Sequence, residues 1–136
     1  MTVEFPESYY TGGLVGFSFG SVQNSYATGA VTGGRYAGGA AGAGNFLSTS
    51  YSTGAVSGAY PGGFIGFGDD DFSDYWDVTT SGTDVGVGEG NSTGVTGLTS
   101  QQLQAGLPAG FDPTIWGQNA NINNGLPYLL ANPPPQ

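Results

Sequence analysis

The chain repeats a short glycine-rich motif at a nearly constant spacing, and this repeat limits the possible folds more than any other feature. Two glycines, two small or apolar residues and a third glycine occur at residues 12–16, 38–42 and 62–66. A second pattern, centred on three tyrosines, runs out of phase with the first at the same spacing of 24 to 26 residues. A period in this range is typical of solenoids, propellers and other repeat arrays.

The repeats favour strands over helices. Short β-prone segments, such as residues 14–17 and 30–32, alternate with glycines, and no long segment has the 3.6-residue period of an amphipathic helix. One repeat, at roughly 3.3 Å per strand residue, is long enough to form one coil of a β-helix with glycines at its corners. We therefore expect an all-β fold, a right-handed parallel β-solenoid of about three coils. Tyr26, Tyr51 and Tyr75 would stack in it as an aromatic ladder.

The chain contains few charged residues, and nearly all of them are acidic. Arg35 is the only basic residue against 10 acidic ones, and the formal net charge is −9. Stacked coils bring equivalent residues within about 4.8 Å of each other, so columns of Ser, Thr, Asn and Gly avoid the repulsion that like charges would cause.

Composition also excludes several functions. A single cation cannot neutralise the phosphates of a nucleic acid. The sequence has no His and no Cys, which removes imidazole bases, thiolate nucleophiles and the usual zinc ligands. No apolar run approaches the roughly 20 residues of a membrane-spanning helix. We expect neither nucleic-acid binding nor membrane insertion.

The first repeat carries a family resemblance. Residues 12–16 read GGLVG, and residues 20–33 read GSVQNSYATGAVTG. This order resembles the GLUG repeat of filamentous-haemagglutinin-like bacterial adhesins. Four later segments resemble the coil that closes such arrays and the module that follows it, at residues 74–77, 97–104, 111–117 and 123–129.

The resemblance implies a secreted or bacterial cell-surface β-solenoid stalk, of which this chain would be a C-terminal fragment or a small relative. The second repeat departs from the family pattern, because Ala40 and Ala41 stand where larger apolar residues are usual. We expect Phe46 and Leu47 to fill its core instead.

The patterns divide the chain into five parts. We expect a partial N-terminal coil at residues 1–10, GLUG-type solenoid repeats at 11–82, a Gly/Ser/Thr-rich loop or an irregular coil at 83–97, a C-terminal cap at 98–130 and a Pro-rich tail at 131–136. Thr99 and Gln102 form a capping box that begins a short helix in the cap. The cap, with Phe111 and Trp116, would cover the open end of the solenoid, where strand edges are otherwise unpaired.

Asp69, Asp70, Asp71 and Asp74 form the densest acidic cluster of the sequence. Carboxylates at this density suit a hard cation such as Ca²⁺, so a calcium site is one interpretation. The cluster lacks the glycine and the glutamate that an EF-hand loop requires. The favoured interpretation is a solvated turn whose charge blocks further strand addition.

Aromatic residues raise a second binding hypothesis. Tyr36, Tyr60 and Trp76 could present their rings to a glycan if they face outward, as could Phe67 and Phe72. The alternative, which we favour, is that these rings are buried.

Catalysis is not expected. Asp74 and Asp77 could in principle act as paired acids on a polysaccharide, and β-helices host such enzymes, but fold alone does not imply function. We expect no catalytic residues and no cofactor apart from the open question of Ca²⁺.

The predicted function is a secreted or cell-surface structural and adhesion module, a stiff stalk whose partner is a glycan or protein of a host or neighbouring cell. End-to-end association into a homo-oligomer or filament is a further expectation. The alternatives are a carbohydrate-binding module and, less favoured, a polysaccharide-degrading β-helix enzyme.

Overall fold

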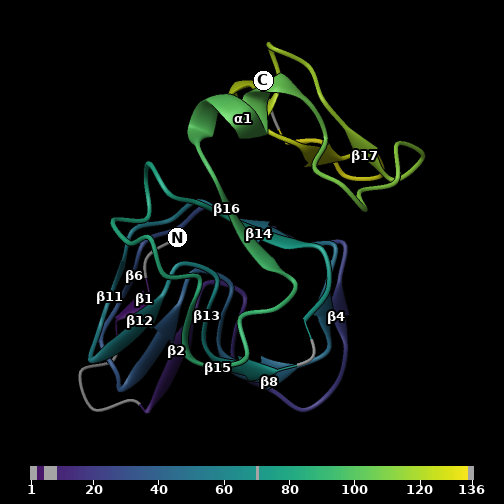
Figure 1. Ribbon diagram of the computed structural model, residues 1–136. Helices are drawn as coiled ribbons and strands as arrows, with labels where there is room; N and C mark the ends of the chain where they lie inside the picture. Colours follow the sequence, from purple (N-terminus) through teal and green to yellow (C-terminus); the bar gives the residue numbers. More distant parts are fainter. Residues whose placement is uncertain (1–2, 5–8, 70, 135–136) are drawn as a thin grey trace.

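Strands of successive turns pair in parallel, one above another, over most of the chain (Figure 1). The structure is a computed structural model that describes residues 3–4, 9–69 and 71–134. Its strands form a β-solenoid of about four turns, and a small module follows at the C-terminal end. The predicted parallel β-solenoid is confirmed, with about four turns in place of three.

Among the described residues, the turns contribute strands to five sheets. The first sheet contains β2 (Tyr10–Gly12), β7 (Tyr36–Gly38) and β12 (Tyr60–Gly62). The second contains β3 (Val15–Ser18), β8 (Ala41–Asn45), β13 (Ile65–Asp69) and β15 (Val87–Gly90). The third contains β4 (Val22–Gln23) and β9 (Leu47–Ser48). The fourth contains β5 (Tyr26–Ala27), β10 (Tyr51–Ser52), β14 (Asp74–Asp77) and β16 (Val95–Leu98). The fifth contains β1 (Val3–Glu4), β6 (Val31–Thr32) and β11 (Val56–Ser57).

The register of these sheets follows the sequence repeat. Tyr26, Tyr51 and Tyr75 share one column of the fourth sheet, as predicted. The rings of Tyr26 and Tyr51 are stacked, with centroids 5.2 Å apart and planes 4° from parallel. Equivalent residues of successive turns therefore lie directly above one another.

Leu47 fills the interior beside the small side chains of the second repeat. It is fully buried and belongs to the same apolar cluster as Ala40 and Ala41, as expected. Phe46 was expected to help fill this space, but 53% of it is exposed. Neighbouring residues at this corner point to opposite sides of the wall, so only one of the pair can enter the core.

The third glycine of each motif allows two sheets to touch. A Cβ atom on Gly42 would collide with the backbone nitrogen of Thr11, and one on Gly66 would lie 2.8 Å from the backbone nitrogen of Ala37. The first and second sheets thus lie in backbone contact (β2 and β12 beside β13 and β15 in Figure 1). Any side chain in this column would force them apart, so the motif requires glycine there.

The corner that precedes the fourth sheet is a polar column. Asn24, Thr49 and Ser73 all adopt left-handed backbone conformations, with φ of 51°, 50° and 55°. The Thr49 hydroxyl donates a hydrogen bond of 2.7 Å to the side-chain oxygen of Asn24. Left-handed backbone recurs at this corner in each repeat, although of these three residue types only Asn adopts it readily. The hydrogen bond between Thr49 and Asn24 helps to hold the corner in this conformation.

Residues 83–97 do not form a loop, the first of the two structures predicted for them, but continue the solenoid. They contain β15 and part of β16, which pair with β13 and β14 as a fourth turn. Val87 is in register with Ile65. A Cβ atom on Gly88 would collide with the backbone of the first sheet, so Gly88 has the same role as Gly66 in the preceding turn. The fourth turn is shorter than the others, so its motif falls outside the period seen in the sequence.

The C-terminal module contains one short helix and two short strands. These elements are α1 (Ser100–Ala105), β17 (Trp116–Gly117), the 3-10 turn η1 (Asn123–Gly125) and β18 (Tyr128–Leu129). The predicted capping box is present: the side chain of Thr99 accepts from the Gln102 backbone, and that of Gln102 from the Thr99 backbone.

The module packs against the side of the solenoid. Phe111 and Trp116 contact the tyrosine ladder of the fourth sheet, and Trp116 lies 5.9 Å from the rings of both Tyr26 and Tyr51. Figure 1 shows the module beyond β14 and β16, outside the wall of the coil. These aromatic residues were expected to cover the open end. They lie on the flank instead, because the outward-facing tyrosines form an apolar strip across three turns that is otherwise exposed to water.

Candidate functional site

A second ladder of tyrosines covers the outer surface of the first sheet. Tyr10, Tyr36 and Tyr60 occupy one register column. The rings of Tyr10 and Tyr36 are stacked at 5.7 Å, and those of Tyr36 and Tyr60 at 5.6 Å. The parallel register sets this spacing, because each ring lies above the ring of the preceding turn.

Two phenylalanines of the second sheet extend this ladder sideways. Phe17 meets the ring of Tyr10 edge to face at 5.0 Å, and Phe67 meets the ring of Tyr36 in the same way at 5.5 Å. Ala43 lies between the two phenylalanines in the register column. Its small side chain leaves a gap between the two rings.

The gap belongs to a groove of about 410 Å³. Phe19 and Phe46, which are 94% and 53% exposed, line it together with the polar side chains of Ser18 and Asn45. We call the surface that carries this groove the aromatic face, and it consists of Tyr10, Phe17, Phe19, Tyr36, Phe46, Tyr60 and Phe67. A contiguous exposed aromatic surface of this kind is typical of a binding site.

Phe46 adopts an unfavourable backbone conformation at this groove. Its φ is 60°, in the left-handed region that bulky side chains rarely enter. Such strain costs on the order of 1–3 kcal/mol and tends to be retained where it serves a function. Here it directs a large apolar ring outward instead of into the core.

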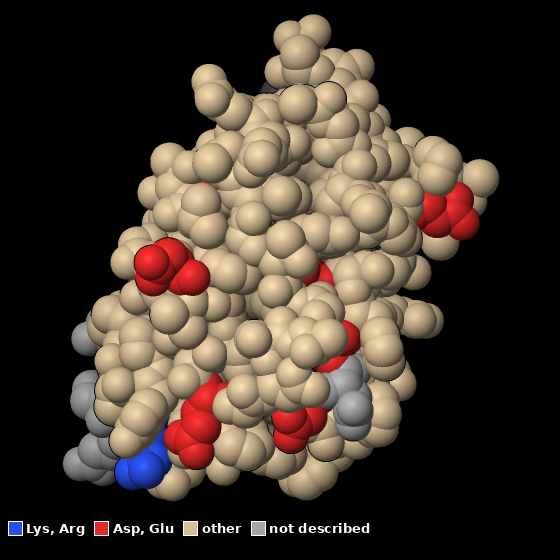
Figure 2. All heavy atoms as spheres, in the orientation of Figure 1, with Lys and Arg blue, Asp and Glu red and all other residues tan. Residues whose placement is uncertain are grey.

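The single basic residue of the chain lies on the same side of the solenoid. The guanidinium of Arg35 is 5.7, 5.6 and 5.1 Å from the ring centroids of Tyr9, Tyr36 and Tyr60. The Tyr36 hydroxyl donates a hydrogen bond of 2.9 Å to the carboxylate of Glu89. Figure 2 shows this one basic patch, with acidic side chains scattered singly over the visible face. Cation–π contacts of this kind hold the ladder rings in place.

The predicted glycan contacts have different positions in the structure. Tyr60 is 41% exposed and Tyr36 is mostly covered by its neighbours, although both belong to the aromatic face. Trp76 is only 7% exposed and points into the solenoid, where its indole nitrogen donates to the carbonyl of Thr83. The indole ring of Trp76 therefore does not lie on the surface, where a sugar ring could stack against it.

The sequence prediction missed Phe17, Phe19 and Phe46. A signal was present for the first of these, because a Gly-Phe pair recurs at residues 16–17 and 66–67. The outward direction of the rings depends on the close contact of two sheets, which the repeat pattern alone does not reveal.

The predicted calcium ligands that the structure describes, Asp69, Asp71 and Asp74, form no group that could hold a metal ion. Asp71 accepts a hydrogen bond from the backbone nitrogen of Leu47, and Asp74 from that of Ser50. Asp69 accepts from the backbone nitrogen of Asn91, and Asp70 lies outside the described residues. Within residues 3–4, 9–69 and 71–134, no three acidic side chains lie close enough together to hold a metal ion.

Three acidic residues of this segment are buried, which corrects the prediction of a fully solvated turn, whereas Asp69 is only half-buried. Asp71, Asp74 and Asp77 are all less than 3% exposed. Burial raises the pKa of Asp74 to about 8, and the nearby Asp71 carboxylate contributes to the rise. Asp77 accepts hydrogen bonds from the backbone of Thr79 and Thr80. Each carboxyl group thus satisfies backbone N–H groups at a corner.

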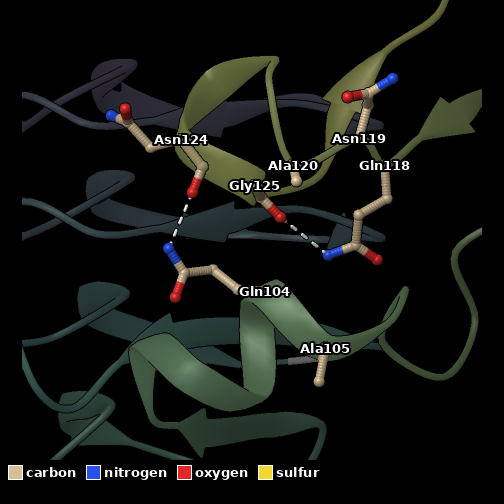
Figure 3. A pocket seen from close by; sticks show the side chains of 7 residues that line it. All are labelled: Gln104, Ala105, Gln118, Asn119, Ala120, Asn124 and Gly125. Carbon is tan, nitrogen blue, oxygen red and sulfur yellow. Dashed lines mark hydrogen bonds between the residues drawn. The ribbon is translucent and has the colours of Figure 1, made fainter.

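A second recess lies in the C-terminal module, between α1 and the segment 118–125 (Figure 3). It measures about 470 Å³ and is lined by Gln104, Ala105, Gln118, Asn119, Ala120, Asn124 and Gly125. We call it the amide cleft, because four of its seven lining residues carry a carboxamide and none carries a charge. The sequence patterns gave no indication of it.

Comparisons with known proteins identify the repeat. A family model of the GLUG motif matches residues 7–32, which contain β2 to β6. This confirms the resemblance at the level of the motif. The comparisons with curated proteins and with solved structures gave no match. No helix in the part of the chain that the structure describes is both long and apolar enough to span a membrane.

Proposed function

We propose that this chain, which carries a GLUG motif on a β-solenoid, is a secreted or cell-surface adhesion module that binds neutral glycans through its aromatic face. The solenoid itself is a structural repeat module. The observation that carries the proposal is the groove in which Phe17, Phe19, Phe46 and Phe67 remain exposed beside the tyrosine ladder.

The chemistry of the aromatic face favours a sugar. The face of an aromatic ring carries partial negative charge, and it attracts the weakly positive C–H groups that line one side of a pyranose. Ser18 and Asn45 add hydrogen-bonding groups at the groove. The net charge of −9 disfavours an anionic ligand, so the glycan would be neutral.

The scaffold supports this role because it is rigid. The residues of the aromatic face come from three successive turns whose strands are joined by continuous parallel ladders. A site held in its binding geometry loses little conformational entropy when a ligand arrives.

A glycan array with matched variants tests the proposal. We expect saturable binding to neutral glycans and at least a tenfold loss of affinity in the double variant Phe17→Ala/Phe67→Ala, since two stacking contacts are removed. Phe72→Ala is the control, because Phe72 is 62% exposed but lies outside the groove. An array without binding, or equal binding by both variants, contradicts the proposal.

Self-association is a second candidate activity. β3 and β15 are the outermost strands of the second sheet among the described residues, so each has one edge on which a further strand can pair. Exposed strand edges of this kind template pairing with another chain. Sedimentation over a wide concentration range tests this: assembly should grow with concentration, and a strict monomer contradicts it.

A further inference from the structure

The amide cleft has walls that are fixed by its own hydrogen bonds. The side-chain nitrogen of Gln118 donates to the carbonyl oxygens of Leu103 at 2.6 Å and Gly125 at 3.0 Å. The side-chain nitrogen of Gln104 donates to the carbonyl oxygen of Asn124 at 2.7 Å, as Figure 3 shows. These bonds hold both carboxamides in defined orientations on opposite sides of the cleft.

One wall is also anchored to the solenoid. Asn123, Asn124 and Gly125 are three consecutive residues with positive φ, of 52°, 55° and 80°. The side-chain nitrogen of Asn123 donates to the Tyr51 hydroxyl at 3.1 Å and to the carbonyl of Pro127 at 2.9 Å. A segment in such a conformation persists only when its surroundings hold it, and here a buried tyrosine of the fourth sheet does so.

The lining determines the class of ligand. No ionisable side chain lines the cleft, so nothing there would hold a metal ion, a phosphate or a carboxylate by charge. Both N–H groups of the Gln118 carboxamide are used within the module, so its oxygen is the atom that can accept hydrogen bonds from the hydroxyl groups of a sugar. The Gln104 carboxamide has one N–H group engaged with Asn124 and can offer the second. Ala120 adds a small apolar contact for the C–H groups of a sugar ring, whereas the methyl group of Ala105 points away from the segment 118–125 in Figure 3. The volume of about 470 Å³ lies within the range of small-molecule sites.

We propose that the amide cleft is a binding site for a neutral saccharide of one or two sugar units, separate from the aromatic face. The cleft lies in the C-terminal module, whereas the aromatic face lies on the first and second sheets of the solenoid. A chain with two such sites would attach to a glycan surface at two points, and its avidity would exceed the affinity of either site.

NMR titration of the ¹⁵N-labelled chain with lactose, cellobiose and N,N′-diacetylchitobiose tests this proposal. We expect at least one of these disaccharides, in the millimolar range, to shift the side-chain amide signals of Gln104 and Gln118. Gln104→Ala should weaken the binding about threefold to tenfold, since it removes a polar contact and one support of the wall. Ala120→Trp should abolish binding by filling the cleft while leaving its hydrogen bonds in place.

Gln101→Ala, on the exposed side of the same helix, is the control and should bind as the unchanged chain does. Unchanged signals from the solenoid strands will show that each variant is folded. The proposal is overturned if none of the three disaccharides shifts the cleft signals, or if Ala120→Trp binds normally. The NMR signals of the aromatic face are followed separately, so the experiment can show binding at one site and no binding at the other.

Discussion

The hydroxyl of Tyr51 donates a hydrogen bond of 2.5 Å to the carbonyl oxygen of Pro127. Tyr51 lies in the second turn of the solenoid and is fully buried, whereas Pro127 follows the 3-10 turn of the C-terminal module. The same hydroxyl accepts a hydrogen bond from Asn123. One buried oxygen atom therefore joins the two parts of the fold.

Tyr51→Phe should loosen the C-terminal module. The change removes two hydrogen bonds of one buried hydroxyl, while the Asn123 side chain still donates to the Pro127 carbonyl, so we expect a loss of about 1–2 kcal/mol of unfolding free energy. Urea denaturation and limited proteolysis of the module measure the effect. Tyr60→Phe, on the partly exposed aromatic face, is the control and should change the midpoint little. Equal stability of the two variants would show that the bond contributes nothing.

The stability of the fold should fall as the pH rises from about 4 to 8. The folded-state pKa of Asp74 is about 8, compared with an ordinary value of 3.8, so the folded chain holds this proton more tightly than the unfolded chain. The stabilising effect is complete below the unfolded pKa and is lost as the pH rises through the folded pKa. For one ideal group the slope is about 1.4 kcal/mol per pH unit within this window.

Asp74→Asn should flatten this pH dependence, because the amide oxygen can still accept from Ser50 without a charge. Denaturant midpoints measured across the window give the slope for each variant. Asp84→Asn, an exposed acidic position, should retain the original slope. A slope that Asp74→Asn leaves intact would assign the pH dependence to another group.

Gly42→Ala should be strongly destabilising, and Gly20→Ala should not. A Cβ atom on Gly42 would collide with the backbone of the neighbouring sheet, whereas nothing lies within 4 Å of the Cβ position of Gly20. Overpacking of a rigid contact costs typically about 1–3 kcal/mol or more. Thermal unfolding compares the two variants directly. If both alanines are tolerated equally, the close contact of the first and second sheets is not essential.

Removal of calcium should leave the melting temperature unchanged. The carboxyl oxygens of Asp71 and Asp74 accept hydrogen bonds from the backbone of the preceding turn, a role that needs no cation. Calorimetry in EDTA and in millimolar Ca²⁺ provides the measurement. A clear decrease in EDTA would instead indicate that the acidic cluster stabilises the fold through a bound ion.

Much of the solenoid could be predicted because the sequence repeat directly sets the register in which strands of successive turns pair. Once Tyr26, Tyr51 and Tyr75 are seen at equal spacing, parallel stacking places them in one column. The fourth turn was not predicted as a regular repeat because it is shorter than the others, so Val87 does not follow Ile65 at the spacing of the earlier repeats. The strands nevertheless pair with Val87 and Ile65 in register. A fixed-period comparison cannot recognise a turn that has lost part of its loop.

The candidate sites were harder to predict, for a geometric reason. Whether a ring such as Trp76 or Phe67 points inward or outward depends on which sheets lie back to back, and the spacing of the repeat is compatible with either direction. The amide cleft depends on a turn of three residues with positive φ, ending at Gly125. Such a turn leaves no periodic signature in the sequence.

The attachment of the C-terminal module to the flank of the solenoid has a mechanical consequence. The module contacts the rings of Tyr26, Tyr51 and Tyr75, which belong to three successive turns. A pulling load on the C-terminal end would be shared among those turns and would act in shear along the column of rings. The coils would then resist tension together instead of peeling away one at a time.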